Sequence, residues 1–195
     1  MGSGGETAVR AGNARDTIAF LDSYQEGLKA KVEARMAPGV MQKMVETPRT
    51  GWIPLSVDRQ FVDALVEELG PDGAVKLIRA SVSTHFNSAL LRTLVQGAKI
   101  FGAGPRGLYK LLPRGWSLVY RGMGTPIALP EPSDTQAINF ELLEAPQLVL
   151  ESPGYTASFE AILQGILDVS KVDGIVESWT DIEQQRWCAR ARWSN

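Results

Sequence analysis

The chain has 195 residues, of which 44% are hydrophobic and 22% charged, which is enough for one domain with a buried core. Twenty basic and twenty-two acidic side chains leave a formal net charge of −2, which excludes a global field that favours nucleic acid or an anionic membrane. A single cysteine excludes an internal disulfide framework, and no apolar run approaches the roughly 20 residues that span a bilayer.

The N-terminal segment, "MGSGGETAVRAGNAR", lacks the apolar core of a signal peptide. We therefore expect a flexible tail over residues 1–15, a single domain over 16–195, and a cytoplasmic protein. The texture of the sequence divides this domain into a helical half, 16–121, and a half with extended segments, 122–195.

Helical periodicity dominates the first half. Apolar residues recur near helical spacing from Asp16 to the break at Pro38, and they predict a first long helix that is weakened at Gly27. Ser56 is predicted to cap a second helix, whose apolar stripe ends at Gly70. After a short helix in "DGAVKLIRAS", we expect Thr84 to cap another helix that runs to Phe101.

The stretch "FGAGPRGLYK" has glycines at the spacing of a dinucleotide-binding fingerprint, at Gly102, Gly104 and Gly107. That fingerprint needs a strand before the glycines and an acidic residue about 20 residues further on. Here a predicted helix precedes them, the first downstream acid is Glu131 in a Pro-rich loop, and Pro105 removes an amide. We interpret the stretch as the end of one helix and the start of the next.

The helix that starts at Pro105 is strongly amphipathic at 100° per residue. Pro113 and Gly115 are expected to kink it. One arc is basic, and it is either a solvated face or a docking surface for an acidic partner or anionic ligand. The basic residues are Arg106, Lys110, Arg114 and Arg121, and the apolar arc holds Leu108, Leu111, Leu112, Trp116, Leu118 and Val119.

The second half predicts a β-β-α-β-β unit. "TPIAL" and "QAINFELL" have the composition of strands, an apolar helical pattern runs from Tyr155 to Leu167, and "GIVESWT" and "QRWCARARW" are joined by "DIEQ" as a hairpin. The fold class is therefore α+β, with a helical half followed by an antiparallel sheet.

The last strand alternates, with tryptophan and alanine on one side and arginine on the other. An RNA-binding sheet needs aromatics among the basic residues of its exposed face, and here Trp187 and Trp193 point the opposite way. A solvated edge paired with Glu177 is the favoured interpretation. Cys188 is either an inert strand cysteine, which we favour, or a thiolate activated by the neighbouring arginines.

His85 is the only histidine, and no nucleophile motif accompanies it. One histidine and one cysteine do not build a usual zinc site. We therefore predict no catalytic residues and no metal ligands. "STHFN" at a predicted helix start favours a surface or capping histidine over a ligand.

Four features together resemble known families: the helical half, "GWIPLS" before a helix, "LLPRGWSLVYRGMG", and the terminal β-β-α-β-β unit. They are similar to an uncharacterised paralogous family of myxobacteria, which in turn resembles the vinyl-reductase-type small-molecule-binding domain and the heme-nitric-oxide/oxygen-binding domain. The resemblance covers about Asp16 to Trp193. It implies a sensory or regulatory module of bacterial signalling, with a ligand between the helical half and the sheet.

The sequence departs from the heme-binding relatives. The resemblance implies a proximal histidine on the helix that leads into the sheet and a Tyr-x-Ser-x-Arg motif for the heme propionates, and this chain has neither. His85 lies one helix too early. We therefore expect no heme and predict no cofactor.

Two function classes follow. The first is a non-enzymatic module that binds a small apolar or aromatic ligand, with Trp116, Tyr120 and His85 as candidate wall residues. The second is a protein-interaction or dimerisation module, for which Arg106, Lys110 and Arg114 are candidate docking residues. An enzyme ranks third. A pocket with one or two convergent polar groups would favour the first class, and a filled core with an exposed apolar patch the second.

Overall fold

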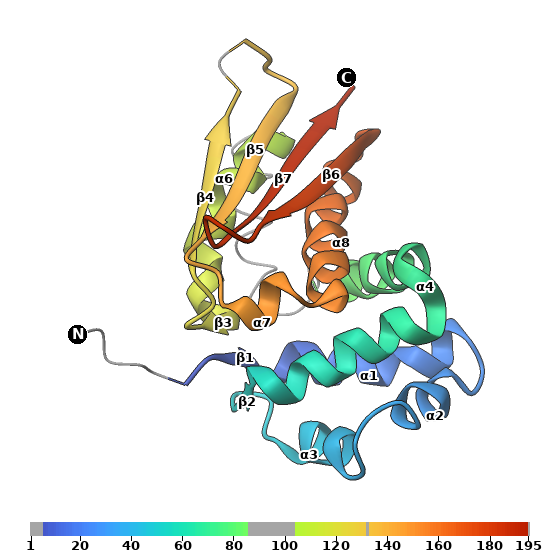
Figure 1. Ribbon diagram of the computed structural model, residues 1–195. Helices are drawn as coiled ribbons and strands as arrows, with labels where there is room; N and C mark the ends of the chain where they lie inside the picture. Colours follow the sequence, from blue (N-terminus) through green and yellow to red (C-terminus); the bar gives the residue numbers. More distant parts are fainter. Residues whose placement is uncertain (1–5, 86–103, 132, 195) are drawn as a thin grey trace.

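The computed structural model describes residues 6–85, 104–131 and 133–194. It combines helices with antiparallel sheets, which confirms the α+β class. A layer of N-terminal helices lies at one end of a four-stranded sheet, and one long helix of the C-terminal half lies between them (Figure 1).

The helical half begins with α1 (Ala11–Tyr24), α2 (Leu28–Glu33) and α3 (Val40–Glu46). The single long helix expected from Asp16 is wrong, because the chain breaks fully at Gly27, whose φ is 73°. Gly39, with a φ of 80°, starts α3 in the same left-handed conformation. The sequence analysis missed α3, which has only seven residues.

Helix α4 (Leu55–His85) joins two predicted helices. Gly70 has non-helical angles, φ 72° and ψ 166°, so the predicted stop is a kink within one longer element. Ser56 is the second residue of α4 and Thr84 the last but one, so neither residue is an N-cap and both predicted caps are wrong. The predicted helix between Thr84 and Phe101, with Gly102 after it, falls almost wholly outside the described residues.

A small antiparallel sheet of order β2-β1-β3 joins distant segments. Its strands are β1 (Ala8–Arg10), β2 (Trp52–Pro54) and β3 (Tyr120–Arg121). The guanidinium groups of Arg10 and Arg121 lie 4.0 and 3.9 Å from the ring of Trp52. Residues 1–15 were expected to form a flexible tail, but strand β1 and the first turn of α1 lie within this range. Strand β1 is ordered because it pairs with β2 and β3.

The C-terminal half confirms the predicted β-β-α-β-β order. It is preceded by α6 (Pro105–Val119), the last helix of the helical half, which starts at Pro105 as expected and continues through Pro113 and Gly115, where a kink was expected. The strands are β4 (Thr125–Pro130), β5 (Ala137–Leu143), β6 (Gly174–Asp181) and β7 (Arg186–Trp193), and the helices between them are α7 (Gln147–Leu150) and α8 (Pro153–Ser170). All pairs in the order β4-β5-β7-β6 are antiparallel.

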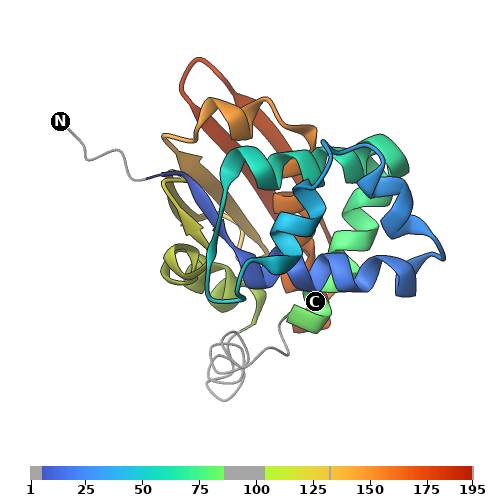
Figure 2. The same ribbon diagram turned by 90° about the horizontal axis from the view of Figure 1, so that it is seen from below.

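One face of this sheet is packed. The side chains of Phe140, Trp187 and Ala189 are buried on it, and the ring of Phe159 on α8 lies 5.2 Å from that of Trp187. Tyr109 of α6 donates a hydrogen bond to the Leu163 carbonyl at 2.8 Å, so α6 and α8 share the same side of the sheet. Seen from below, α1 to α4 spread over α8 on the side away from the strands (Figure 2).

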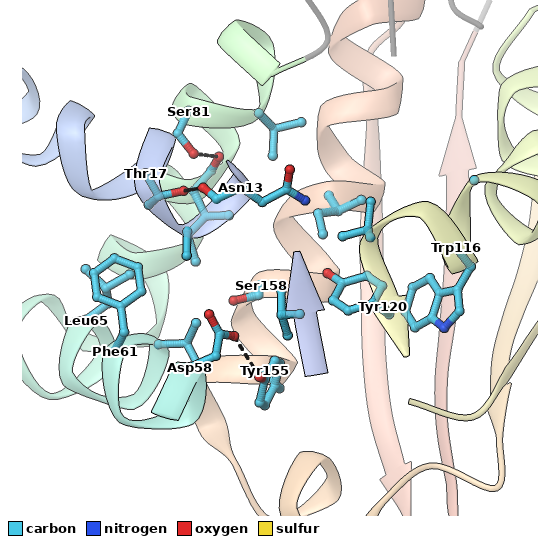
Figure 3. Close-up of a pocket in the computed structure, with 18 of the residues that line it drawn as sticks. Asn13, Thr17, Asp58, Phe61, Leu65, Ser81, Trp116, Tyr120, Tyr155 and Ser158 are labelled. Atoms are coloured by element: carbon cyan, nitrogen blue, oxygen red, sulfur yellow. Dashed lines mark hydrogen bonds between the residues drawn. The ribbon is translucent and has the colours of Figure 1, made fainter. Parts of the chain in front are cut away.

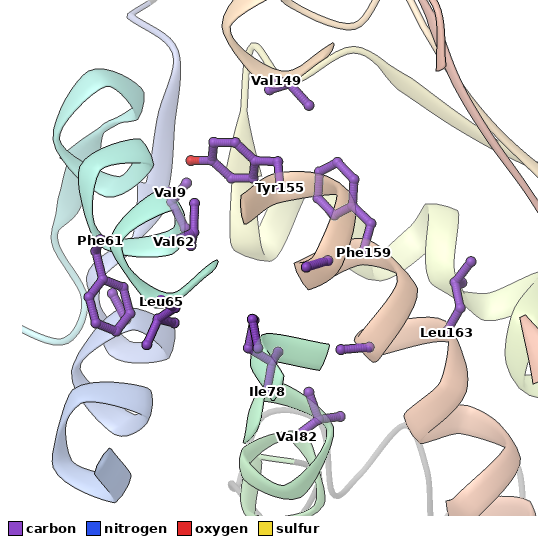
Figure 4. Packing of buried hydrophobic residues seen from close by; sticks show 14 of the residues in the cluster. Val9, Phe61, Val62, Leu65, Ile78, Val82, Val149, Tyr155, Phe159 and Leu163 are labelled. Carbon is purple, nitrogen blue, oxygen red and sulfur yellow. The ribbon is translucent and has the colours of Figure 1, made fainter. Parts of the chain in front are cut away.

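The two halves meet where the N-terminus of α8 packs on α4 (Figure 4). A Cβ added to Gly154 would lie 2.3 Å from the backbone carbon of Val62, so the helices approach closely at this residue. The Asp63 carboxylate accepts hydrogen bonds from the Gly154 N–H, at 3.0 Å, and from the Ser152 hydroxyl. Ser152 in turn caps α8 by accepting from the Tyr155 N–H. Donors of a helix start and a carboxylate therefore fix this junction.

We predict that Gly154→Ala lowers the free energy of unfolding by about 2–3 kcal/mol, because the helices must separate to admit a methyl group. Gly115→Ala is the matched control, since its added Cβ has no neighbour within 4 Å. That variant should be stabilised by about 0.5–1 kcal/mol through the restricted unfolded chain. Urea unfolding measures the free energy of unfolding of both variants. A Gly154→Ala protein as stable as the wild type would contradict the close approach of α8 to α4.

Candidate functional site

A cavity of about 160 Å³ lies between helices α1 and α4 on one side and helices α6 and α8 on the other. Its wall is mostly apolar, with a few polar side chains directed inward (Figure 3). The described lining residues are Val9, Asn13, Ala14, Thr17, Asp58, Phe61, Val62, Leu65, Ile78, Ser81, Val82, Leu112, Gly115, Trp116, Val119, Tyr120, Tyr155, Ser158 and Ile162.

Helix α4 contributes to the wall on both sides of its kink. Phe61 and Leu65 precede Gly70, and Ile78 and Val82 follow it. A straight helix rises about 1.5 Å per residue, so the two ends of a straight α4 would be too far apart to line the same cavity. The non-helical residue at Gly70 therefore lets one helix line two walls of one cavity.

Asp58 is the one carboxylate among the described lining residues, and only 4% of its surface is exposed. Its Oδ2 accepts a hydrogen bond from the Tyr155 hydroxyl at 2.7 Å. Burial raises the pKa of Asp58 to about 6, and the Tyr155 hydrogen bond opposes part of that rise. Burial, together with the charge of Asp58, holds the pKa of Tyr155 well above its usual value, so the phenol remains the donor.

The hydroxyl groups in the wall have used their donors locally. Thr17 donates to the Asn13 carbonyl at 3.2 Å, Ser158 donates to the Gly154 carbonyl at 2.7 Å, and Ser81 donates to the Ile78 carbonyl at 2.8 Å. These bonds satisfy the hydroxyl hydrogens within helix turns. The hydroxyl oxygens of Thr17 and Ser158 therefore remain as acceptors in the cavity wall.

Trp116 and Tyr120, predicted as wall residues, both line the cavity. Their ring centroids are 4.3 Å apart, and each ring also contacts Phe159 of α8, at 5.5 and 6.0 Å. The Trp116 indole N–H is buried without a hydrogen-bond partner among the described residues, so the carbon surface of the ring forms the wall. Burial, followed by the charge of Asp58, raises the pKa of Tyr120, which keeps its hydroxyl neutral.

The cavity differs in position from the expected one. We expected a ligand between the helical half and the sheet, but none of the described lining residues comes from β4, β5, β6 or β7. Helix α8, which contributes Tyr155, Ser158 and Ile162 to the wall, lies between α4 and those strands (Figure 1). The third predicted wall residue, His85, ends α4, and its side chain lies outside the described part of the structure.

Only part of the basic arc of α6 is exposed to solvent. Arg106 is half-buried and donates a hydrogen bond to the Glu131 carbonyl at 3.2 Å, whereas Lys110 and Arg114 are exposed. Arg121 lies beyond the helix, over Trp52. Of the apolar arc, Leu108 is buried, but Leu118 is 39% exposed. Docking of a partner by Arg106, Lys110 and Arg114 stays a prediction.

The alternation expected for the last strand is confirmed in β7. Trp187, Ala189, Ala191 and Trp193 are buried, and the Arg192 guanidinium lies 3.6 Å from the Glu177 carboxylate across the hairpin. Cys188 is also buried, and burial followed by the charge of Glu141 raises the pKa of its thiol. The raised pKa favours the inert thiol over the thiolate.

Within the described ranges, no group of three or more His, Cys, Asp and Glu side chains is arranged to hold a metal ion. In the same ranges, no helix has the length and apolar composition needed to cross a membrane.

The sequence analysis missed Asp58 and Tyr155. Asp58 lies three, four and seven residues before Phe61, Val62 and Leu65, which places its carboxylate in the apolar stripe of α4. A charge inside an apolar stripe was the available signal. It was missed because acidic residues are common in the first turn of a helix, where they face the dipole from the solvent.

Solved structures of H-NOX domains share this fold over almost the whole chain. An unliganded Fe(II) H-NOX protein from K. algicida is 8% identical, with a TM-score of 0.63 over 96% of this chain and 97% of that one. An oxygen-binding H-NOX domain related to soluble guanylate cyclases is 14% identical, with a TM-score of 0.62 over 95% of each chain. A mutant of the T. tengcongensis H-NOX is 13% identical, with a TM-score of 0.58 over 95% of this chain and 98% of that one.

No protein-family model matches the sequence, and no curated protein does. The identities to the solved structures are low enough that the likeness shows the fold alone. The resemblance to the heme-nitric-oxide/oxygen-binding domain is thereby confirmed for the fold. The resemblance to the vinyl-reductase-type domain and to the myxobacterial family stays a prediction.

The raised pKa of Asp58 predicts a pH-dependent stability. Because the folded pKa of about 6 exceeds the ordinary aspartate pKa of 3.8, the contribution of Asp58 to stability is fully present below about pH 4 and is lost as the pH rises through 6. Relative to Asp58→Asn, the wild type should lose about 2–3 kcal/mol of unfolding free energy between pH 4 and pH 7.

Urea unfolding of both proteins at several pH values measures this difference. Asp72→Asn is the control, because Asp72 is exposed on the same helix and should give no comparable loss. A difference between wild type and Asp58→Asn that does not change with pH would show that Asp58 titrates as in water.

Proposed function

We propose that this protein is a non-enzymatic sensory or regulatory module that binds a small apolar or aromatic molecule in the cavity between its two halves. The observation that carries the proposal is the mostly apolar cavity, with one buried carboxylate, at the place where α4 and α6 of the helical half face α8 of the second half. A few convergent polar groups in an apolar pocket are typical of small-molecule sites.

The position of the cavity supports a regulatory role. A ligand there would contact Phe61 on α4, Trp116 on α6 and Ile162 on α8 at once. Its binding energy would therefore depend on how the halves are packed, and the arrangement that binds better would become more populated. Helix α6 leads into β3, which pairs with β1, so a shift of α6 would reach the N-terminal segment.

The size of the cavity supports a ligand close to benzene or toluene in size. An engineered apolar cavity of about 150 Å³ binds benzene, whereas drug-sized ligands occupy about 300–1,000 Å³. At about 160 Å³, this cavity is comparable with the first. A porphyrin needs a pocket of the second class, which is larger than this cavity.

The side chains of the cavity also do not fit a heme, the cofactor that is named for one of the similar H-NOX structures. Heme iron is held by His, Cys, Met or Tyr. The described lining includes none of the first three, and its tyrosines have raised pKa values that oppose a phenolate. It also includes no Lys or Arg to pair with propionates, and it presents the carboxylate of Asp58 instead.

Several expectations from the sequence remain predictions: the protein-interaction or dimerisation alternative, the cytoplasmic location, the bacterial signalling context and the absence of catalysis. Exposed apolar side chains do occur on and just after β6, at Ile175, Trp179 and Ile182. The cavity is nevertheless the feature by which the two classes were to be distinguished, and it favours ligand binding.

Toluene is a suitable first probe of the cavity. At 100 times its dissociation constant, it should stabilise the wild type by about 2.7 kcal/mol. Gly115→Leu should abolish this stabilisation, because a side chain at Gly115 enters open space in the cavity wall. Ser117→Leu adds the same side chain on an exposed position of α6 and should leave binding unchanged.

Thermal unfolding with and without toluene measures the stabilisation of the wild type, Gly115→Leu and Ser117→Leu. Isothermal titration calorimetry measures the affinity of each protein for toluene. If neither toluene nor benzene stabilises the wild type, or if Gly115→Leu binds as the wild type does, the proposed site is wrong.

Protein purified from heme-replete cells should be colourless, because the described donors do not fit a heme. Absorbance near the Soret maximum, compared with the protein absorbance, is the measurement. A strong Soret band would contradict the expectation, and its loss in His85→Ala would identify the ligand as the single histidine.

A further inference from the structure

The carboxylate of Asp58 has one oxygen that the fold does not use. Oδ2 accepts from the Tyr155 hydroxyl, and no hydrogen bond or ion pair joins Oδ1 to any residue that the structure describes. The side chain is 4% exposed and lines the cavity. Figure 3 shows its second oxygen directed into the space between α4, α1 and α8.

The cavity provides no charge to balance this carboxylate. The lining residues from α1, α6 and α8 are neutral, and no Lys, Arg or His is among the lining residues described. The neighbouring Arg59 is paired with Asp63, at 3.0 Å between Nε and Oδ2. A buried carboxylate without a cation is unfavourable unless a partner is supplied or the carboxyl takes up a proton.

The other polar atoms that face the cavity suit a ligand that donates hydrogen bonds. The hydroxyl oxygens of Thr17 and Ser158 are free to accept, because their hydrogens are bonded to helix carbonyls. The side chains of Asn13 and Tyr120 point toward the same space (Figure 3), and each has an acceptor oxygen beside its donor hydrogens. The features specific to this cavity are therefore one carboxylate and the acceptor oxygens of Thr17 and Ser158, surrounded by apolar side chains, and they match an apolar molecule with one cationic, donor-rich end.

We propose that the ligands of this cavity are small primary amines, whose ammonium group pairs with the free oxygen of Asp58 and whose apolar part packs against Phe61, Leu112 and Ile162. This inference rests on the proposed function, since it names the chemical class of that ligand. It adds a positive charge to the small apolar or aromatic molecule that the cavity volume supports.

The two partners define a pH range for binding. Asp58 is ionised above about pH 6, and an alkylammonium stays charged up to about pH 10, as lysine does. The ion pair is therefore complete from about pH 7 to 9 and is lost when Asp58 is protonated in acid. An uncharged ligand of the same shape has no such dependence.

Benzylamine, benzyl alcohol and toluene are matched probes for this charge. Calorimetric titration of the wild type at pH 7.5 should give a benzylamine affinity about 10-fold to 100-fold above that of toluene, with benzyl alcohol between them. At pH 5, the benzylamine advantage should fall at least several-fold while toluene binding is unchanged. Asp58→Asn should remove the advantage at both pH values and still bind toluene, and the exposed control Asp72→Asn should keep it.

The outcomes separate this inference from the proposed function. Toluene binding without a preference for benzylamine at pH 7.5 overturns the amine proposal and leaves the cavity function intact. The same holds for a preference that survives in Asp58→Asn. Failure of all three probes overturns both. If Asp58→Asn does not fold, the pH dependence of the wild type decides, because a preference that is equal at pH 5 and pH 7.5 also overturns the proposal.

Discussion

The contact between the start of α8 and the first half of α4 is the constraint on which the remainder of the structure depends. Gly154 allows the two backbones to approach, and Asp63 accepts the hydrogen bonds of the Gly154 amide and the Ser152 hydroxyl. One turn away, Asp58 and Tyr155 form the next bond across the same contact. The polar end of the cavity is therefore set by the contact that joins the halves.

The cavity follows from how the other elements are placed around this contact. The kink at Gly70 turns α4 along a second wall, and the aromatic group of Trp116, Tyr120 and Phe159 holds α6 against α8. Residue 115 in the cavity wall is a glycine, and an added Cβ there would meet no other atom within 4 Å. Protein interiors are normally packed without voids of this size, so a cavity at the meeting of two halves is an indication of ligand binding.

The sequence predicted the parts of the fold that are determined locally. The alternation in "QRWCARARW" and the Pro105 helix start are signals within a few residues, and both are confirmed. The strands β1 and β3 were missed because they have three and two residues and pair with partners far along the chain. Trp116 was predicted as a wall residue because helix periodicity reports which face is apolar. Asp58 was not, because an acid in the first turn of a helix usually faces the solvent, and here α8 covers it and Tyr155 bonds to it.

The central claim is that the space between α4, α6 and α8 accepts a small apolar guest. A crystal of the protein pressurised with xenon tests it most directly, because xenon occupies apolar cavities of this size without needing a matched polar group. We expect a xenon peak between Phe61, Leu112 and Ile162. A xenon-treated crystal with no peak there, and with side chains filling that space, would contradict it.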